Sequence, residues 1–273
     1  MAKQNKNEYF KTFITGKSNI LAYRASLELS TNSDTIYNPL FIYGKTGLGK
    51  THLLKAIEHS VIKDNKKVLY ITAEQFANDF TLHIKNSSME EFRRKYRNLD
   101  LFLIDDIQFI SGREQTQEEL IHIFNELTHN KKQVVITSSQ NPFQIVGFHN
   151  ELKSRFSQGL VSKIKKPSHK TKISIIKHKC KFHKLDLTKN IIQYIAKNSP
   201  NSVTSLVGHL VKIKAHSTLL HQEINFNLVR DILEENNIPS KKDTIDNDTM
   251  TNGFFSSNQL LKIEFNKEVY DGR

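Results

Sequence analysis

The sequence predicts an α/β protein in which a parallel sheet is followed by a smaller, all-helical domain. Three observations favour this class: four short apolar runs typical of buried strands, helical periodicity between those runs, and the loss of any strand pattern after Pro167. Strands that alternate with helices along a chain form a parallel sheet covered on both faces. A length of 273 residues allows one large domain or two modest ones.

The four apolar runs are rich in β-branched and aromatic residues, and polar or glycine-containing turns bound each of them. We expect each run to be a strand buried in the sheet. The runs occupy residues 39–43, 68–72, 101–104 and 134–137.

A well-defined helix is expected at residues 116–129. Thr116 and Glu119 form a T-x-x-E pattern, which predicts a capping box at the start of this helix. Its apolar residues recur at intervals of three and four, as on one face of an amphipathic helix. They are Leu120, Ile123, Phe124 and Leu127.

Beyond Pro167 the apolar residues recur only at helical spacing. We therefore expect helices around residues 173–182, 191–196, 205–220 and 227–235. This change of pattern divides the chain into a nucleotide-binding core, a helical domain and a short tail. The predicted boundaries are 1–165, 166–237 and 238–273.

The composition indicates a soluble protein of the cytoplasm. The sequence contains 37% hydrophobic and 25% charged residues, and it has neither a long apolar run nor a cleavable leader. Its single cysteine, Cys180, can form no internal disulfide and has no metal-ligating neighbour at zinc-like spacing. Neither a disulfide scaffold nor a zinc module is therefore supported.

The formal charge of +12 points to a polyanionic partner. Nucleic acid is the first candidate, an acidic phospholipid surface the second, and a lysine-rich composition bias the third explanation. The excess is local: residues 163–185 hold nine lysines and no acid, whereas residues 236–273 hold five basic and six acidic residues. We select Lys163, Lys165 and Lys166 as candidate DNA contacts.

Residues 44–51 read G-K-T-G-L-G-K-T and match the P-loop pattern G-x-x-x-x-G-K-[ST] between a strand and a helix. Glycines let successive backbone N–H groups face phosphates, Lys50 reaches the β- and γ-phosphates, and the Thr51 hydroxyl ligates Mg²⁺. The predicted nucleotide contacts here are Gly44, Gly47, Leu48, Gly49, Lys50, Thr51 and His52.

A second buried strand ends in two carboxylates, as the magnesium side of such a site requires. Asp105 is assigned to Mg²⁺, and Asp106 is assigned to orient or deprotonate the attacking water. The run at 134–137 continues into hydroxyl residues, and Ser139 is a candidate sensor of the γ-phosphate. The predicted cofactors are ATP and Mg²⁺.

Longer motifs surround these residues. They read Y-N-P-L-F-I-Y-G at 37–44, L-G-K-T-H-L at 48–53, I-D-D-I-Q-F at 104–109 and L-K-S-R-F at 152–156. Together they resemble the DnaA family of bacterial replication initiators. The resemblance covers about residues 9–235 and implies a three-layer P-loop AAA+ core with a helical lid.

The resemblance also implies an assembly that ATP or ADP controls on single-stranded or origin DNA. Arg155 would be an arginine finger that reaches a neighbour's γ-phosphate, either in a second copy or in a full-length initiator. Gly16 and Asn19 would lie beside the adenine. Thr81 and Arg113 would face single-stranded DNA.

Three positions depart from the family pattern. Residues 202–208 read S-V-T-S-L-V-G, which places Thr204 where that family carries a lid arginine. Ser139 replaces an aspartate, and Glu151 replaces an arginine. Because a γ-phosphate cation is missing, the resemblance implies weak ATP hydrolysis at most.

Several roles remain open for such a chain. The segment 238–273 is too short for the helix-turn-helix domain with which the family reads duplex DNA, so we expect none. An initiator-type switch, an Hda-like regulator, a DnaC-like helicase loader and a non-hydrolysing DNA-binding scaffold are the alternatives. Residues 4–10 lack the central aliphatic of a sliding-clamp peptide, so a clamp partner is not expected.

Overall fold

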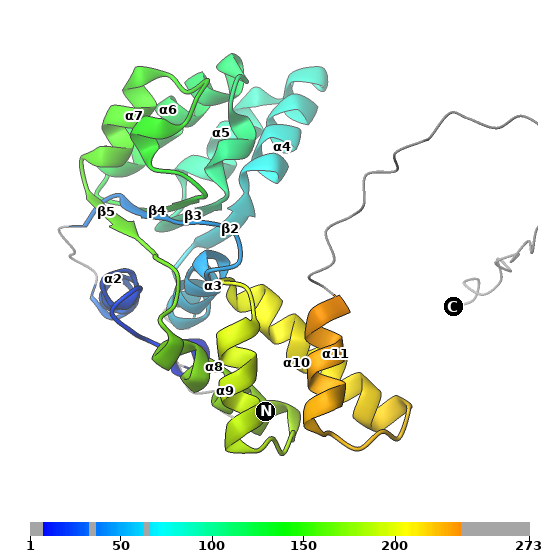
Figure 1. Cartoon of the computed structure of the whole chain (residues 1–273). Coiled ribbons are helices and arrows are strands. Elements are labelled where there is room, and N and C mark those ends of the chain that lie inside the picture. The colour runs from blue at the N-terminus through cyan, green and yellow to red at the C-terminus, as the bar shows by residue number, and fades with distance from the viewer. Residues whose placement is uncertain (1–7, 33–36, 63–65, 236–273) are drawn as a thin grey trace, which may run out of the picture. The chain divides into compact units, whose positions relative to one another are not determined.

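A five-stranded parallel sheet organises the protein, as a computed structural model shows (Figure 1). The structure describes residues 8–32, 37–62 and 66–235. The strands are β1 (Leu40–Tyr43), β2 (Val68–Thr72), β3 (Leu101–Asp105), β4 (Gln133–Ser138) and β5 (Leu160–Lys163), in the spatial order β2-β3-β4-β1-β5. The four predicted strands are confirmed, whereas β5 was missed.

The fifth strand pairs with β1 at the edge of the sheet, with Leu40 opposite Leu160 and Tyr43 opposite Lys163. Its sequence L-V-S-K is half polar, and Lys163 is exposed. An edge strand tolerates such residues because only one of its sides is paired. For this reason no apolar run marks it in the sequence.

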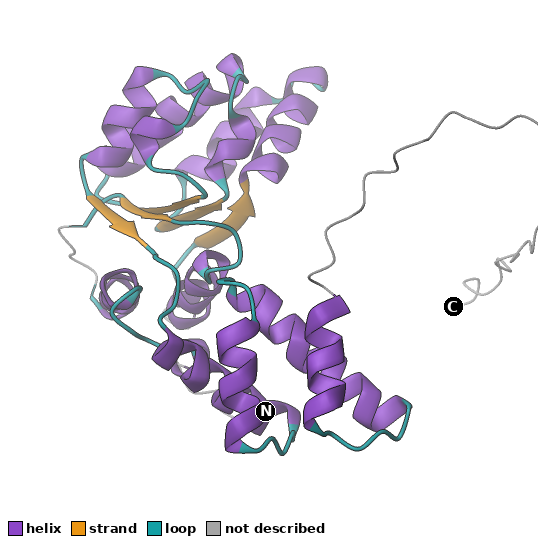
Figure 2. Ribbon diagram, viewed as in Figure 1, coloured by secondary structure: helices purple, strands orange, loops and turns teal. Residues whose placement is uncertain are grey.

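Helices cover both faces of the sheet, which confirms the predicted α/β class (Figure 2). Successive residues of β1 point to opposite faces: Leu40 and Ile42 pack with the first helical layer and Phe41 with the second. The first layer comprises α1 (Glu8–Thr12), α2 (Ile20–Thr31) and α3 (Lys50–Val61). The second comprises α4 (Ala73–Lys85), α5 (Met89–Arg97), α6 (Glu114–His129) and α7 (Asn150–Ser157).

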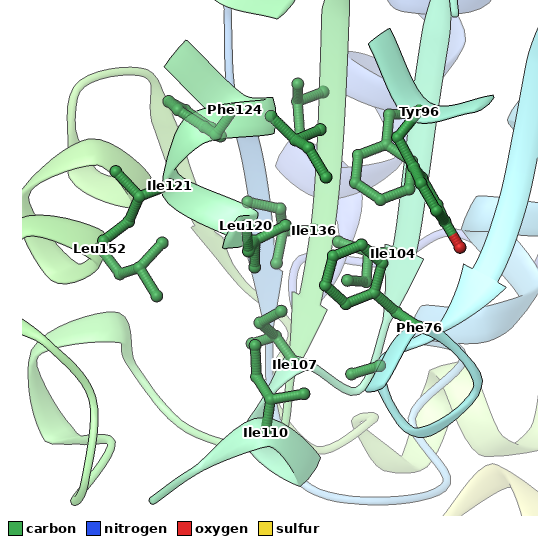
Figure 3. Close-up of a cluster of buried hydrophobic side chains, with 14 of the residues drawn as sticks. Phe76, Tyr96, Ile104, Ile107, Ile110, Leu120, Ile121, Phe124, Ile136 and Leu152 are labelled. Atoms are coloured by element: carbon green, nitrogen blue, oxygen red, sulfur yellow. The ribbon is translucent and has the colours of Figure 1, made fainter. Parts of the chain in front are cut away.

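The second layer encloses an aromatic cluster around Phe76 and Tyr96, both fully buried (Figure 3). The Tyr96 hydroxyl donates to Asp79 over 2.7 Å and so joins α5 to α4. Neighbouring basic residues are also engaged, because Arg93 pairs with Glu119 at 3.0 Å. The basic run at 93–97 thus fastens α5 to its neighbours.

The capping box predicted for α6 is wrong. The helix begins at Glu114, and its N-cap Arg113 makes no side-chain capping bond. Thr116 and Glu119 lie inside the helix and are buried, and Glu119 accepts hydrogen bonds from Arg93 instead. The Glu119 carboxylate, which the local pattern assigned to a cap, therefore forms an ion pair with Arg93 of another helix.

Four helices follow the sheet and share their own buried cluster, as the periodicity after Pro167 predicts. Ser168, Thr188 and Ser202 cap three of them through side-chain oxygens. The domain boundary at 165/166 stays a prediction, and the tail at 238–273 lies outside the described residues. The helices are α8 (His169–His183), α9 (Lys189–Asn198), α10 (Val203–Leu219) and α11 (Phe226–Glu235).

Within the described residues, no helix combines the length and apolar character needed to cross a bilayer.

The aromatic cluster gives the first prediction. We expect Phe76→Ala to lower the free energy of unfolding by about 3–5 kcal/mol, because it removes a fully buried ring. Phe182→Ala is the matched control, since that ring is 74% exposed and should cost under about 0.5 kcal/mol. Urea denaturation measures both, and equal losses would contradict the assigned core.

Candidate nucleotide-binding site

The loop between β1 and α3 adopts a conformation that only glycine takes readily. Gly47 has φ of 78° and Gly49 has φ of 98°, both in the left-handed region. Gly49 is also the N-cap of α3, and a Cβ there would lie 3.0 Å from the ring of Phe13. Two sequence positions therefore shape the loop that presents the helix N-terminus, where anions bind.

Lys50 is the first residue of α3 and is only 6% exposed. Its ammonium group donates to the backbone oxygens of Gly44, at 2.9 Å, and Lys45, at 3.4 Å. Burial lowers the pKa of Lys50, against the opposing effect of the carboxylates Asp106 and Asp105. A buried cation of this kind is stabilised by an anion in the loop.

The carboxylate of Asp105 ends β3 and is 3% exposed. It accepts hydrogen bonds from Thr51 at 2.7 Å, from Tyr70 at 3.0 Å and from Thr137. Burial, and next the neighbouring Asp105 charge, raise the pKa of Tyr70 far above its ordinary value. The Tyr70 hydroxyl therefore remains a proton donor to the carboxylate.

Asp106 is held in the left-handed region with φ of 53°, which is uncommon for a residue with a side chain. Its backbone N–H donates to Thr137 over 2.9 Å, and its carboxylate accepts from Gln108 over 3.1 Å. Gln108 belongs to the short helix η2 (Ile107–Ile110) and accepts from the backbone N–H of Ser139 at 3.0 Å. These bonds fix the direction of the second carboxylate.

A cavity of about 480 Å³ lies over this cluster. The P-loop, the segment before α2 and the helices α8 and α10 all contribute to its wall, and Asp106 lines it too. The backbone N–H groups of Val203 and Thr204 donate to the oxygen of Gly47 over 2.8 and 3.3 Å. The start of α10 is thereby attached to the P-loop itself.

The donor set suits a triphosphate with Mg²⁺. A hydroxyl and a carboxylate oxygen meet at 2.7 Å beside the loop, and Mg²⁺ takes few protein oxygens when phosphates and water supply the rest. The described residues contain no group of three or more His, Cys, Asp and Glu that could hold a metal alone. Thr51 and Asp105 would thus share the ion with the nucleotide.

A family model described as the bacterial DnaA ATPase domain matches residues 4–163, more than half of the chain. The chain belongs to the DnaA family. It is 50% identical over 231 residues to the chromosomal replication initiator protein DnaA of Aliarcobacter butzleri. This match covers 85% of this chain and 53% of that protein. The chain spans about half the length of the curated relatives it matches.

Solved DnaA structures share the fold. Domain III of the Thermotoga maritima DnaA matches with a TM-score of 0.80 at 36% identity, over 85% of this chain and 98% of that one. A replication initiator DnaA bound to AMPPCP and single-stranded DNA matches with a TM-score of 0.77 at 36% identity. This match covers 86% of this chain and 71% of that one.

Some predicted site residues of this DnaA-family chain line the cavity with the P-loop. His52 is one, and its ring lies 2.9 Å from the backbone oxygen of Tyr9, while burial lowers its pKa. Asn19 is another and is 8% exposed. Its amide binds the backbone of Gly16 and Ile14 at 2.8 and 3.1 Å, so it also shapes the segment before α2.

Other predicted residues lie in neighbouring hollows or on the surface. Ser139 lines a neighbouring hollow together with Lys163, and Lys166 lies between two such hollows, whereas Lys165 lines both hollows and the cavity as well. Thr81 on α4 and Arg113 before α6 are exposed. Their assigned DNA contacts stay predictions.

Sequence reasoning missed two residues of the carboxylate cluster. Tyr70 reaches Asp105 only because β2 and β3 pair in the register Thr72 opposite Asp105, which the sequence does not reveal. Gln108 could have been found, because it belongs to the I-D-D-I-Q-F motif directly after the carboxylates.

The contacts of Thr137 give the second prediction. We expect Thr137→Val to lower the free energy of unfolding by about 1–3 kcal/mol, because the buried Asp105 carboxylate and the Asp106 N–H each lose a partner. Thr218→Val is the control, since Thr218 is exposed on α10 and bonds only its own helix. Equal costs in urea denaturation would argue against the cluster.

Proposed function

We propose that the chain binds ATP with Mg²⁺ and acts as the ATP-controlled unit of a DnaA-type initiator that assembles on DNA in the cytoplasm. The observation that carries the proposal is the 2.7 Å contact between Thr51 and Asp105 beside a glycine-shaped loop. It joins the two motifs that phosphate and metal binding require, and the cavity in front of them has room for a ligand.

Each residue then has a distinct task. The N–H groups at the start of α3 and the ammonium group of Lys50 bind the phosphates. Thr51 and Asp105 would hold Mg²⁺, and the ion would neutralise phosphate charge. Asp106, oriented by Gln108, positions water toward the nucleotide.

Assembly would use surfaces outside this cavity. Arg155 lies on α7, where it is about one-third exposed and 3.4 Å from Glu151, and it does not line the cavity of its own chain. On this proposal Arg155 reaches the nucleotide of a neighbouring molecule, which its exposure and its place outside its own cavity support. Binding of single-stranded DNA through Thr81 and Arg113 is supported by their exposure and by the DNA-bound relative.

The third prediction tests nucleotide binding. We expect Lys50→Ala to weaken the binding of fluorescent ATP about 100-fold, because the phosphates lose a charged donor. Lys45→Ala is the matched control in the same loop, since Lys45 is exposed and its side chain lies outside this cavity. Unchanged affinity in the folded Lys50 variant would refute the proposed site.

The fourth prediction concerns hydrolysis. Thr204 lines the cavity, yet its hydroxyl supplies no positive charge to the transition state, so we expect slow ATP turnover. Thr204→Arg should raise the rate about tenfold or more, because a positioned arginine strongly favours phosphoryl transfer. Val211→Arg, at an exposed position of α10, is the control. Phosphate release measures all three, and rapid wild-type turnover would contradict this account.

A further inference from the structure

A second hollow of about 600 Å³ lies between the segment before α2 and the start of α8. Four lysines line it: Lys17, Lys165, Lys166 and Lys170. The backbone N–H of Lys165 donates to the oxygen of Ser18 over 2.9 Å, which joins the two chain segments at this place. Residues far apart in the sequence therefore form one basic surface.

The electrostatics of this hollow favour an anion. No carboxylate is among the residues that line it, and none of its four ammonium groups pairs with an acid in the described part of the chain. The first turn of α8 borders it and contains no acidic residue. The hydroxyl groups of Ser168 and Thr171 bond each other over 2.9 Å at that helix start.

We propose that this hollow binds the phosphodiester backbone of nucleic acid. The proposal rests on the DNA binding proposed above but assigns it a second surface, separate from Thr81 and Arg113. Lysines neutralise backbone phosphates and release condensed counterions, which is the main source of sequence-independent affinity. Lys17 and Lys170 join the predicted contacts, whereas Lys163 lines the other hollow and approaches the Tyr43 ring.

The lining of the hollow separates a nucleic-acid backbone from other anions. It contains no aromatic ring, so bases have nothing to stack on and only the backbone is bound. It also contains no large apolar side chain that could enter a bilayer, whereas interfacial anchors combine basic and apolar residues. Binding should accordingly be insensitive to base sequence.

The hollow also adjoins the nucleotide cavity. Lys165 and Ser18 line both spaces. A variant that probes the hollow alone therefore keeps Lys165 unchanged.

The experiment compares two triple variants of the full chain. The hollow variant carries Lys17→Gln, Lys166→Gln and Lys170→Gln, which leaves Lys165 and the nucleotide cavity intact. The matched control carries Lys177→Gln, Lys181→Gln and Lys189→Gln, three exposed lysines of α8 and α9 outside both spaces. Fluorescence anisotropy with a mixed-sequence single strand gives affinity across a range of salt concentrations.

We expect the hollow variant to flatten the plot of log affinity against log salt by about 2, as the loss of three phosphate contacts predicts for a single strand. The control should change the slope by less than half as much. Equal slopes in the two variants would overturn the proposal, whereas a wild-type chain that binds no DNA would overturn the proposed function itself.

Two further measurements keep these outcomes distinct. Fluorescent ATP binding should be retained in both variants, which shows that they are folded. Sedimentation with phosphatidylglycerol vesicles tests the other anion: loss of vesicle binding with unchanged DNA binding would assign the hollow to a lipid surface and overturn the proposal.

Discussion

The buried carboxylate of Asp105 is the group on which the candidate site depends. A charge in the interior is costly unless it is fully hydrogen-bonded, and here three hydroxyl groups satisfy it. These hydroxyls come from α3, β2 and β4, so the carboxylate joins a helix and two neighbouring strands to β3. The place where a metal would bind follows from this set of bonds, which also joins α3, the helix directly after the P-loop, to the sheet.

The sequence predicts what is encoded locally. Four strands were found because each is a continuous apolar run, and the P-loop because Gly47 and Gly49 are needed for its left-handed turns. The edge strand β5 was not predicted because half of its residues are polar. The predicted capping box was wrong because Glu119 pairs with Arg93 from another helix. Tertiary pairing, which no local pattern reveals, decided both cases.

The start of α10 is attached to the P-loop through backbone atoms. Val203 and Thr204 bind the oxygen of Gly47 through their backbone N–H groups. Because the attachment uses backbone atoms, it does not depend on the side chain at 204. The side chain alone determines which charge residue 204 presents to the cavity, so a substitution there would change the chemistry without releasing the helix from the P-loop.

In the second hollow, too, backbone atoms hold the structure together while side chains supply the charge. Its frame is the backbone bond between Lys165 and Ser18, which survives any change of the lysine side chains. Its charge comes from side chains that lie in solvent and are thus free to vary without cost to the fold. Because Lys165 and Ser18 also border the nucleotide cavity, a polyanion held here shares its electrostatic field with bound phosphates.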